Sequence, residues 1–183
     1  TTRQNISDVV WAVAGERTQA ERHDLVRGTQ VALPIVPSTA RDVKHGFASV
    51  ANFFPGGKPL IAELDEAIMH RAMGGWNPAK AEVYSDQYIC TGGQLAEVVL
   101  GRDVRPLVYA KMGVQSALAC RPYDLATWLV GQQAGCVVCD PFGEPLDAPL
   151  DVTTNMSVAF YANREIANLL VPIVREEVTR LLC

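Results

Sequence analysis

The sequence predicts an α/β fold with mixed sheets flanked by helices, because strand-like and helix-like segments alternate along the chain. Residues 58–73 place apolar side chains at helical spacing. Residues 136–139 form a short apolar run that is typical of a buried strand. Residues 156–161 have a strand pattern, and a long amphipathic pattern follows Asn163. Neither an internal repeat nor a linker is evident, so we expect residues 1–183 to form a single domain.

The composition is typical of a soluble globular protein. Of the 183 residues, 49% are hydrophobic and 20% are charged, and the formal net charge is -4. Lys and Arg form no cluster that would bind nucleic acid or an anionic membrane surface, so we exclude these partners. Apolar runs stay well short of the roughly 20 residues that a membrane-spanning helix needs. The N-terminal residues also lack a secretion signal, and we expect a cytoplasmic protein.

Five cysteines are present, mostly in apolar surroundings, which indicates reduced, buried thiols rather than disulfides. Cys136 and Cys139 have the spacing of a redox pair. Redox pairs lie at a helix N-terminus, whereas these two lie in a predicted strand, so we interpret them as structural. A zinc site would need further ligands, which the isolated histidines do not supply: His23, His45 and His70.

Two strands with a long, charged connection are expected at the N-terminal end. Residues 8–13 have the pattern of a buried strand, and apolar residues alternate over residues 31–35. Pro34 and Pro37 indicate that the second strand lies at a sheet edge or ends early. A short apolar patch then occupies residues 47–54.

Residues 58–73 are expected to form a helix that covers a sheet and exposes an acidic face, and Gly74-Gly75 should end it. Strand-like residues 82–90 precede Thr91-Gly92-Gly93, after which residues 95–100 suggest another helix. Thr91 is a candidate N-cap. The two glycines would let a phosphate approach the backbone N–H groups, but an ordinary turn explains them equally well.

A short buried strand is expected at residues 107–109, followed by a loop that begins at Lys111. The next helix should run from about Asp124 to Ala134, with Gly135 as its left-handed end. The carboxylate of Asp124 is favoured by the helix dipole, and from the pattern alone it could serve only as a cap.

The last helix is expected to begin after Asn163, which should act as its N-cap, and to reach the end of the chain. Pro172 lies inside this helix and should kink it. Glu176 and Glu177 fall on its polar side, where a solvated face explains them.

Three motifs carry a family resemblance: Pro122-Tyr123-Asp124-Leu125-Ala126, Ala134-Gly135 and Val137-Val138-Cys139-Asp140. They resemble the C-terminal signature of the inositol monophosphatase family, within the Mg²⁺-dependent, lithium-sensitive phosphatases. Further similar segments run from Thr91-Gly92-Gly93 to Gly101-Arg102-Asp103 and from Tyr161-Ala162-Asn163 into the last helix. The resemblance covers most of residues 86–182.

This resemblance implies the C-terminal part of a layered αβαβα sandwich and the Mg²⁺-assisted hydrolysis of a phosphate monoester. It matches Asp124 to a metal ligand and Thr91-Gly92-Gly93 to a substrate or phosphate-binding turn. The stretch in which the family carries a substrate-binding Glu contains Lys111 and no acid here. We therefore include Lys111 among the candidate substrate-binding residues.

The other metal-binding motifs of the family, an N-terminal Glu and an Asp-Pro-Ile/Leu-Asp-Gly-Thr segment, are missing. Asp140-Pro141-Phe142-Gly143 begins like the second motif but lacks its second Asp and its Thr. The N-terminal lobe that bears these motifs is thus absent. Because one Asp cannot hold two or three Mg²⁺ ions at a working geometry, we expect no activity from this chain alone.

We therefore predict a subunit of a split, hetero-oligomeric Mg²⁺-dependent phosphatase that acts on a sugar or cyclitol phosphate. A companion subunit would carry the missing motifs and share the Mg²⁺. This chain would supply Asp124, Thr91-Gly92-Gly93 and the substrate wall. Two alternatives stay open: a non-catalytic scaffold or regulatory subunit with the same fold, and a phosphate site repurposed for another reaction on a polar metabolite.

Overall fold

A computed structural model describes the chain at residues 5–52, 57–77, 79–85, 90–101, 107–111 and 120–183, with only the backbone of residues 107–111. Parts of the sequence predictions lie outside these residues. They include Phe53 and Phe54 of the apolar patch, residues 86–89 of the strand-like approach, and Arg102 and Asp103 of the resemblance.

A five-stranded mixed sheet forms the centre of the molecule, in the order β5-β4-β6-β8-β7. Its strands are β4 (Gly46–Val50), β5 (Val83–Tyr84), β6 (Leu107–Lys111), β7 (Val137–Cys139) and β8 (Val158–Tyr161). β4 pairs in parallel with β5 and β6, and β8 pairs antiparallel with β6 and β7. The carboxyl ends of β4, β5, β6 and β7 therefore lie at one edge of the sheet, which we call the carboxyl edge.

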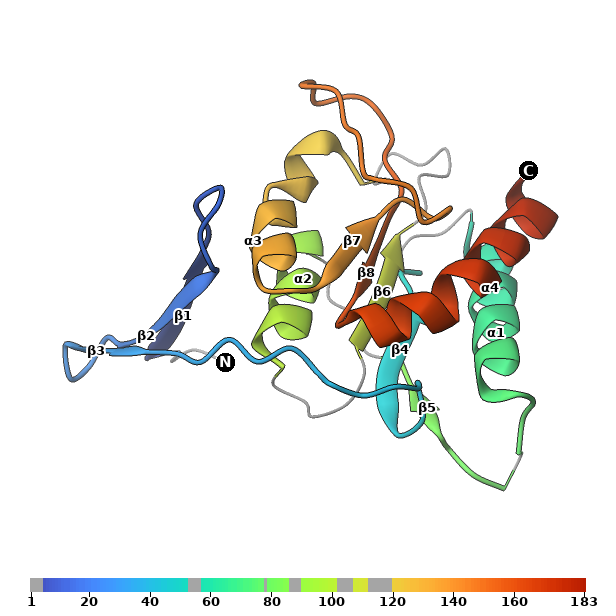
Figure 1. Cartoon of the computed structure of the whole chain (residues 1–183), viewed down its shortest axis with the longest axis horizontal. Coiled ribbons are helices and arrows are strands. Elements are labelled where there is room, and N and C mark those ends of the chain that lie inside the picture. Colours follow the sequence, from blue (N-terminus) through green and yellow to red (C-terminus); the bar gives the residue numbers. More distant parts are fainter. Residues whose placement is uncertain (1–4, 53–56, 78, 86–89, 102–106, 112–119) are drawn as a thin grey trace.

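Helices cover both faces of this sheet, as Figure 1 shows. α1 (Lys58–Met73) and α4 (Arg164–Leu182) pack on one face around Leu64, Ile68 and Leu170. α2 (Thr91–Leu100) and α3 (Trp128–Gln133) pack on the other around Leu95 and Phe160. Each face of the sheet thus has its own hydrophobic core.

A separate antiparallel sheet lies beyond α2 and α3 (Figure 1) and has the order β1-β2-β3. Its strands are β1 (Ile6–Trp11), β2 (Gln19–Asp24) and β3 (Thr29–Ala32). The described chain is therefore layered as sheet, helices, sheet and helices. The predicted α/β class, with mixed sheets flanked by helices, is confirmed.

The N-terminal strands differ from the sequence prediction. β1 was expected to be buried, but Val9 is 44% exposed because its face of the small sheet is open to solvent. β2 was missed, since its charged sequence has no apolar alternation. β3 ends at Ala32, two residues before Pro34, which agrees with the expected early end.

Residues 46–50 also form a strand that the sequence did not predict. β4 is short and carries small and polar residues between Phe47 and Val50. Ser49 is nevertheless 1% exposed, because the strand lies inside the sheet between β5 and β6. Its burial depends on neighbours that are distant in sequence.

α1 and α4 have the bounds that the periodicity predicts. α1 ends at Gly74 in the left-handed conformation, with φ of 73°. Asn163 caps α4, since its Oδ1 accepts a hydrogen bond from Ile166 N at 2.9 Å. Its Nδ2 donates to the carbonyl oxygens of Ser38 and Ala40, which ties the segment after β3 to α4.

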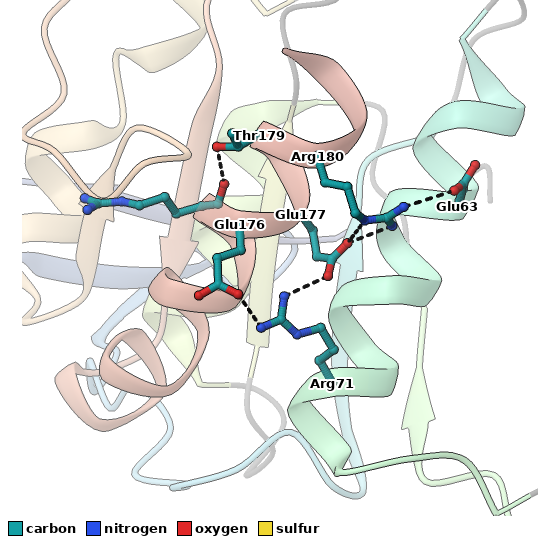
Figure 2. A network of polar contacts seen from close by, with 7 residues as sticks. Glu63, Arg71, Glu176, Glu177, Thr179 and Arg180 are labelled. Atoms are coloured by element: carbon teal, nitrogen blue, oxygen red, sulfur yellow. Dashed lines mark hydrogen bonds and ion pairs between the residues drawn. The ribbon is translucent and has the colours of Figure 1, made fainter.

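The predicted solvated face at Glu176 and Glu177 is wrong for Glu177, which is 6% exposed. Glu177 Oε1 accepts from Arg71 Nη1 at 2.7 Å, and its Oε2 accepts from Arg180 Nε at 2.7 Å. Figure 2 shows this carboxylate between the two guanidinium groups, at the contact of α1 with α4. The side chain is buried because the arginines neutralise its charge.

The expected helix from Asp124 to Ala134 is divided into two. A 3₁₀ helix, η1, covers Pro122–Leu125, and α3 begins only at Trp128. Gly135 has φ of 91°, as a left-handed helix end requires. Among the described residues, no helix is long and apolar enough to cross a membrane.

Candidate functional site

The N-terminus of α2 lies at the carboxyl edge of the central sheet. α2 connects the parallel strands β5 and β6, so it must run back across the sheet from the carboxyl ends of these strands. Its N-cap is Cys90, and the predicted cap, Thr91, is the first helical residue. Thr91 is 2% exposed. The first intrahelical bond runs from Gln94 N to Cys90 O, so the N–H groups of Gly92 and Gly93 have no acceptor within the helix.

Asp124 lies in η1, where its carboxylate and the backbone of Arg121 bond reciprocally. Asp124 Oδ2 accepts from Arg121 N at 2.9 Å, and Asp124 N donates to Arg121 O at 2.9 Å. Asp124 is half-buried, and among the described residues its other oxygen has no hydrogen-bond donor. The capping role that the sequence predicts is therefore present, and one carboxylate oxygen stays available.

The N-terminus of α2 and the segment that carries Asp124 lie next to each other at Gly92 and Thr127. A Cβ added to Gly92 would lie 3.4 Å from Thr127 Cγ2 and 3.9 Å from Thr127 Oγ1. Thr127 is the N-cap of α3 and follows Asp124 by three positions. The structure thus places the turn Thr91-Gly92-Gly93 beside the segment that carries Asp124.

Several buried polar atoms on this side of the sheet have no hydrogen-bond partner within the described part of the chain. Thr127 Oγ1 and Trp128 Nε1 lie at the start of α3, and Gln94 Nε2 belongs to the first turn of α2. Ser49 Oγ lies near the carboxyl end of β4. Buried polar groups are nearly always paired with protein, water or a ligand. Thr127 and Gln94 were missed by the sequence analysis, because only the packing of α2 on α3 brings them to this site.

Lys111 is the last residue of β6, opposite Val158 of β8, so its backbone lies at the carboxyl edge. Its side chain lies outside the described part of the structure. Asp140 also follows a strand at this edge, but its Oδ1 accepts from Phe142 N and Glu144 N, both at 2.8 Å. Asp140 therefore organises a turn.

The described residues do not fit a complete Mg²⁺ site. No three His, Cys, Asp or Glu side chains among them lie close enough together to hold a metal ion. Mg²⁺ requires octahedral coordination by oxygen. Asp124 alone supplies too few oxygens, so any metal bound there would need donors from elsewhere.

Cys136 and Cys139 take no part in this arrangement, and the structural interpretation is confirmed. Both are buried and free, and they belong to the hydrophobic cores on opposite faces of the sheet. Burial raises the pKa of Cys136 to about 12 and that of Cys139 to about 11. The thiolate form that redox chemistry requires is thus suppressed.

Solved structures with a related fold are found, although no family model matches the sequence and no curated protein matches it significantly. Fructose-1,6-bisphosphatase of Leishmania major in the T-state has a TM-score of 0.55 and 13% identity, covering 96% of this chain and 50% of that one. An inositol monophosphatase from Zymomonas mobilis has a TM-score of 0.49 and 10% identity, covering 87% of this chain and 58% of that one. A hypothetical protein from Pyrococcus horikoshii with similarities to inositol-1 monophosphatase has a TM-score of 0.43 and 15% identity, covering 86% and 56%.

The likeness to fructose-1,6-bisphosphatase shows the fold that the resemblance implied, a layered sandwich of sheets and helices. The chain spans between 50% and 58% of the length of these solved structures. At such low identity the likeness establishes the fold alone.

Proposed function

We propose that this chain is one subunit of a phosphate monoester hydrolase related to the inositol monophosphatase family, acting on a sugar or cyclitol phosphate. In this proposal the chain corresponds to the C-terminal half of the family's fold. A companion polypeptide carries the N-terminal Glu and the Asp-Pro-x-Asp-Gly-Thr motif. Mg²⁺ is shared between the two, and the complex works in the cytoplasm.

The observation that carries the proposal is the proximity of Gly92 to Thr127, which brings the N-terminus of α2 next to the segment bearing Asp124. The N–H groups of Gly92 and Gly93, which have no intrahelical acceptor, and the positive end of the dipole of α2 suit a phosphate. Asp124 keeps one oxygen free of described donors, which suits a metal ligand. The likeness to a phosphatase fold supports the same reading of these residues.

The proposed role of each residue follows from the hydrogen-bond donors and the metal-binding oxygen that this chain offers. The first turn of α2 orients the phosphate, the Thr127 hydroxyl offers a further hydrogen bond, and Asp124 contributes one anionic oxygen. The companion supplies the remaining carboxylates, because a complete metal site needs more oxygens than Asp124 provides. We therefore expect phosphate release only from the complex.

The test measures phosphate release from a panel of sugar and cyclitol phosphates after co-expression with a candidate companion that carries the Asp-Pro-x-Asp-Gly-Thr motif. Asp124→Asn is the informative variant, because the amide oxygen can still accept from Arg121 N while the charge is lost. We expect this variant to lower kcat at least a hundredfold, as loss of a metal ligand or its support does. Glu165→Gln, at an exposed position of α4, is the control and should change nothing. Full activity of the Asp124→Asn complex would refute the role of Asp124.

A non-catalytic subunit with the same fold is the second candidate. It is favoured by the hydrogen bond from Arg121 N to Asp124, since a capping function alone accounts for an acid at this position. Isothermal titration of the complex with Mg²⁺ separates the two candidates. Binding that Asp124→Asn weakens supports the hydrolase, and unchanged binding supports the non-catalytic subunit.

A further inference from the structure

A cavity of about 590 Å³ lies at the carboxyl edge of the central sheet, next to α1 and α4, and one of its lining residues, Asn155, is hydrogen-bonded through its side chain to Arg121. Leu60 of α1 and Val178 and Leu181 of α4 contribute to one wall. Residues 140–147, which follow β7, and residues 155–157, which precede β8, line the rest. Neither Thr91-Gly92-Gly93 nor Asp124 reaches it, so the proposed hydrolase function leaves this cavity unexplained.

The lining combines apolar side chains with polar groups and carries negative charge. Most of its residues are apolar, among them Phe142, Leu146 and Met156. The charged lining residues are Asp140 and Asp147, and no Lys, Arg or His is among the described residues that line the cavity. This composition disfavours a phosphate or a carboxylate as ligand.

The two carboxylates differ in their hydrogen bonds to the protein and in their exposure. Asp140 Oδ1 accepts two backbone hydrogen bonds, from Phe142 N and Glu144 N, and so is fixed in direction by its turn. Asp147 is exposed. A cationic group at the mouth of the cavity can therefore approach Asp147 without displacing a structural contact.

We propose that this cavity binds a small organic cation with an apolar body, such as an aryl or alkyl amine. Cavities of about 300–1,000 Å³ that are mainly apolar and have a few polar groups are the usual sites of small ligands. The apolar body would be buried against Leu60, Met156 and Leu181, and the ammonium group would lie near Asp147. This proposal does not depend on the hydrolase function.

The first experiment titrates the full chain with 2-phenylethylamine, 2-phenylethanol and phenylacetate, which share an aromatic body and differ in charge. Amide chemical shifts report both affinity and location. For an amine of this size we expect a dissociation constant of about 1 mM. The amine should bind at least about threefold more tightly than the alcohol, and the acid more weakly than both, and salt should reduce this difference.

Two pairs of variants test the location. Leu60→Trp fills part of the cavity and should weaken the amine at least about fivefold, a loss expected when apolar contacts with the ligand are blocked, whereas Leu150→Trp, at a fully exposed position outside the lining, should not. Asp147→Asn should abolish the preference for the amine over the alcohol, and Glu66→Gln, on the exposed side of α1, should leave it intact.

Equal affinities for the amine and the acid would overturn the proposal, because they would show that the carboxylates do not select the ligand. Shifts that map away from residues 140–147 and 155–157 would also overturn it. So would the absence of binding by all three compounds at about 10 mM, an order of magnitude above the expected constant. Selective binding of the amine, lost in Leu60→Trp and Asp147→Asn, is the supporting result.

Discussion

At the scale of single residues, Asp65 shows how burial changes the pKa of a carboxylic acid. Its Oδ1 accepts a hydrogen bond from Val50 N at 2.8 Å, at the end of β4. Burial raises the pKa of Asp65 to about 6 from its ordinary value of 3.8, although the Val50 hydrogen bond acts in the opposite direction. The folded state therefore binds the proton more tightly than the unfolded state. This contribution to stability is complete below pH 3.8 and is lost as the pH rises through 6.

Asp65→Asn should accordingly stabilise the protein at pH 7 and have little effect near pH 4. The amide oxygen can still accept from Val50 N, and the charge that burial penalises is removed. We expect a gain of about 1–3 kcal/mol at pH 7, the upper limit being the full pKa shift converted to free energy. Urea unfolding at both pH values measures it. Glu66→Gln, an exposed neighbour, should change stability by less than about 0.5 kcal/mol, and a loss of stability in Asp65→Asn would contradict the argument.

Glu177 is the opposite case, because its charge is compensated. Hydrogen bonds from Arg71 and then from Arg180 lower the pKa of Glu177 below its ordinary 4.5. Its contribution to stability is present above pH 4.5 and is lost as the pH falls through the lowered value. The i, i+4 pattern of α4 placed this residue on a polar face, and no sequence pattern indicated that Arg71 of α1 lies opposite.

Glu176 and Glu177 form a matched pair for testing this difference. Glu177→Gln should cost about 1–3 kcal/mol at pH 7, because a buried hydrogen-bonded charge pair is broken. Glu176→Gln should cost less than about 1 kcal/mol, since its side chain is 63% exposed. The two variants should converge as the pH falls to about 3. Equal losses in urea unfolding at pH 7 would show that burial of Glu177 has no energetic consequence.

At the scale of elements, sequence patterns predicted those whose burial repeats with a regular period. α1 and α4 have apolar stripes over many turns, so Lys58–Met73 and the start after Asn163 could be recognised. β2 and β4 are short and carry polar residues, and their position in a sheet is decided by pairing with distant strands. The division between η1 and α3 was likewise invisible in a continuous apolar pattern.

Two glycines end helices in the same left-handed conformation but in different surroundings. Gly74 has φ of 73°, and a Cβ there would meet no atom within 4 Å. Gly101 has φ of 53°, and a Cβ there would lie 1.8 Å from the carbonyl oxygen of Val36. The end of α2 therefore packs against the segment that joins the small sheet to the core, at a distance that only glycine permits.

Gly101→Ala should be clearly more destabilising than Gly74→Ala. Both replacements place Ala at a positive φ, which costs about 1 kcal/mol of stability when Ala replaces a left-handed glycine. Only Gly101→Ala must also move the Val36 backbone, so we expect a total loss of about 3 kcal/mol or more. Thermal and urea unfolding of both variants give the comparison. A Gly101→Ala variant as stable as Gly74→Ala would mean that this segment does not rest on α2.

At the scale of the whole molecule, the layered fold was accessible from the sequence, but the way in which the candidate site residues come together was not. The motif around Asp124 and the turn Thr91-Gly92-Gly93 were identified by resemblance. Their proximity through Gly92 and Thr127 depends on how α2 packs against α3, which no local pattern encodes. The buried hydroxyl of Thr127 became visible as a candidate donor only in three dimensions.

The two sheets should also differ in their resistance to opening. In the central sheet all four residues of β8 are buried, whereas among the residues of β1, β2 and β3 only Ala20 is. Because the small sheet buries so little apolar surface, opening it costs less than unfolding the core. Its hydrogen-bonded amides should therefore exchange with deuterium at least about tenfold faster than those of β8, a ratio that requires a difference of only about 1.4 kcal/mol.

Hydrogen–deuterium exchange by mass spectrometry tests this prediction, with two neighbouring valines as a matched pair. Val10 packs against the core on the α2 side, whereas Val9 is on the opposite face of β1 and is 44% exposed. Val10→Ala should accelerate exchange throughout β1, β2 and β3 and leave β8 unchanged. Val9→Ala should have a much smaller effect, since little surface is lost. If β1 and β8 exchanged at the same rate in the parent chain, the two sheets would form one cooperative unit, and the small sheet would owe its stability to the whole core.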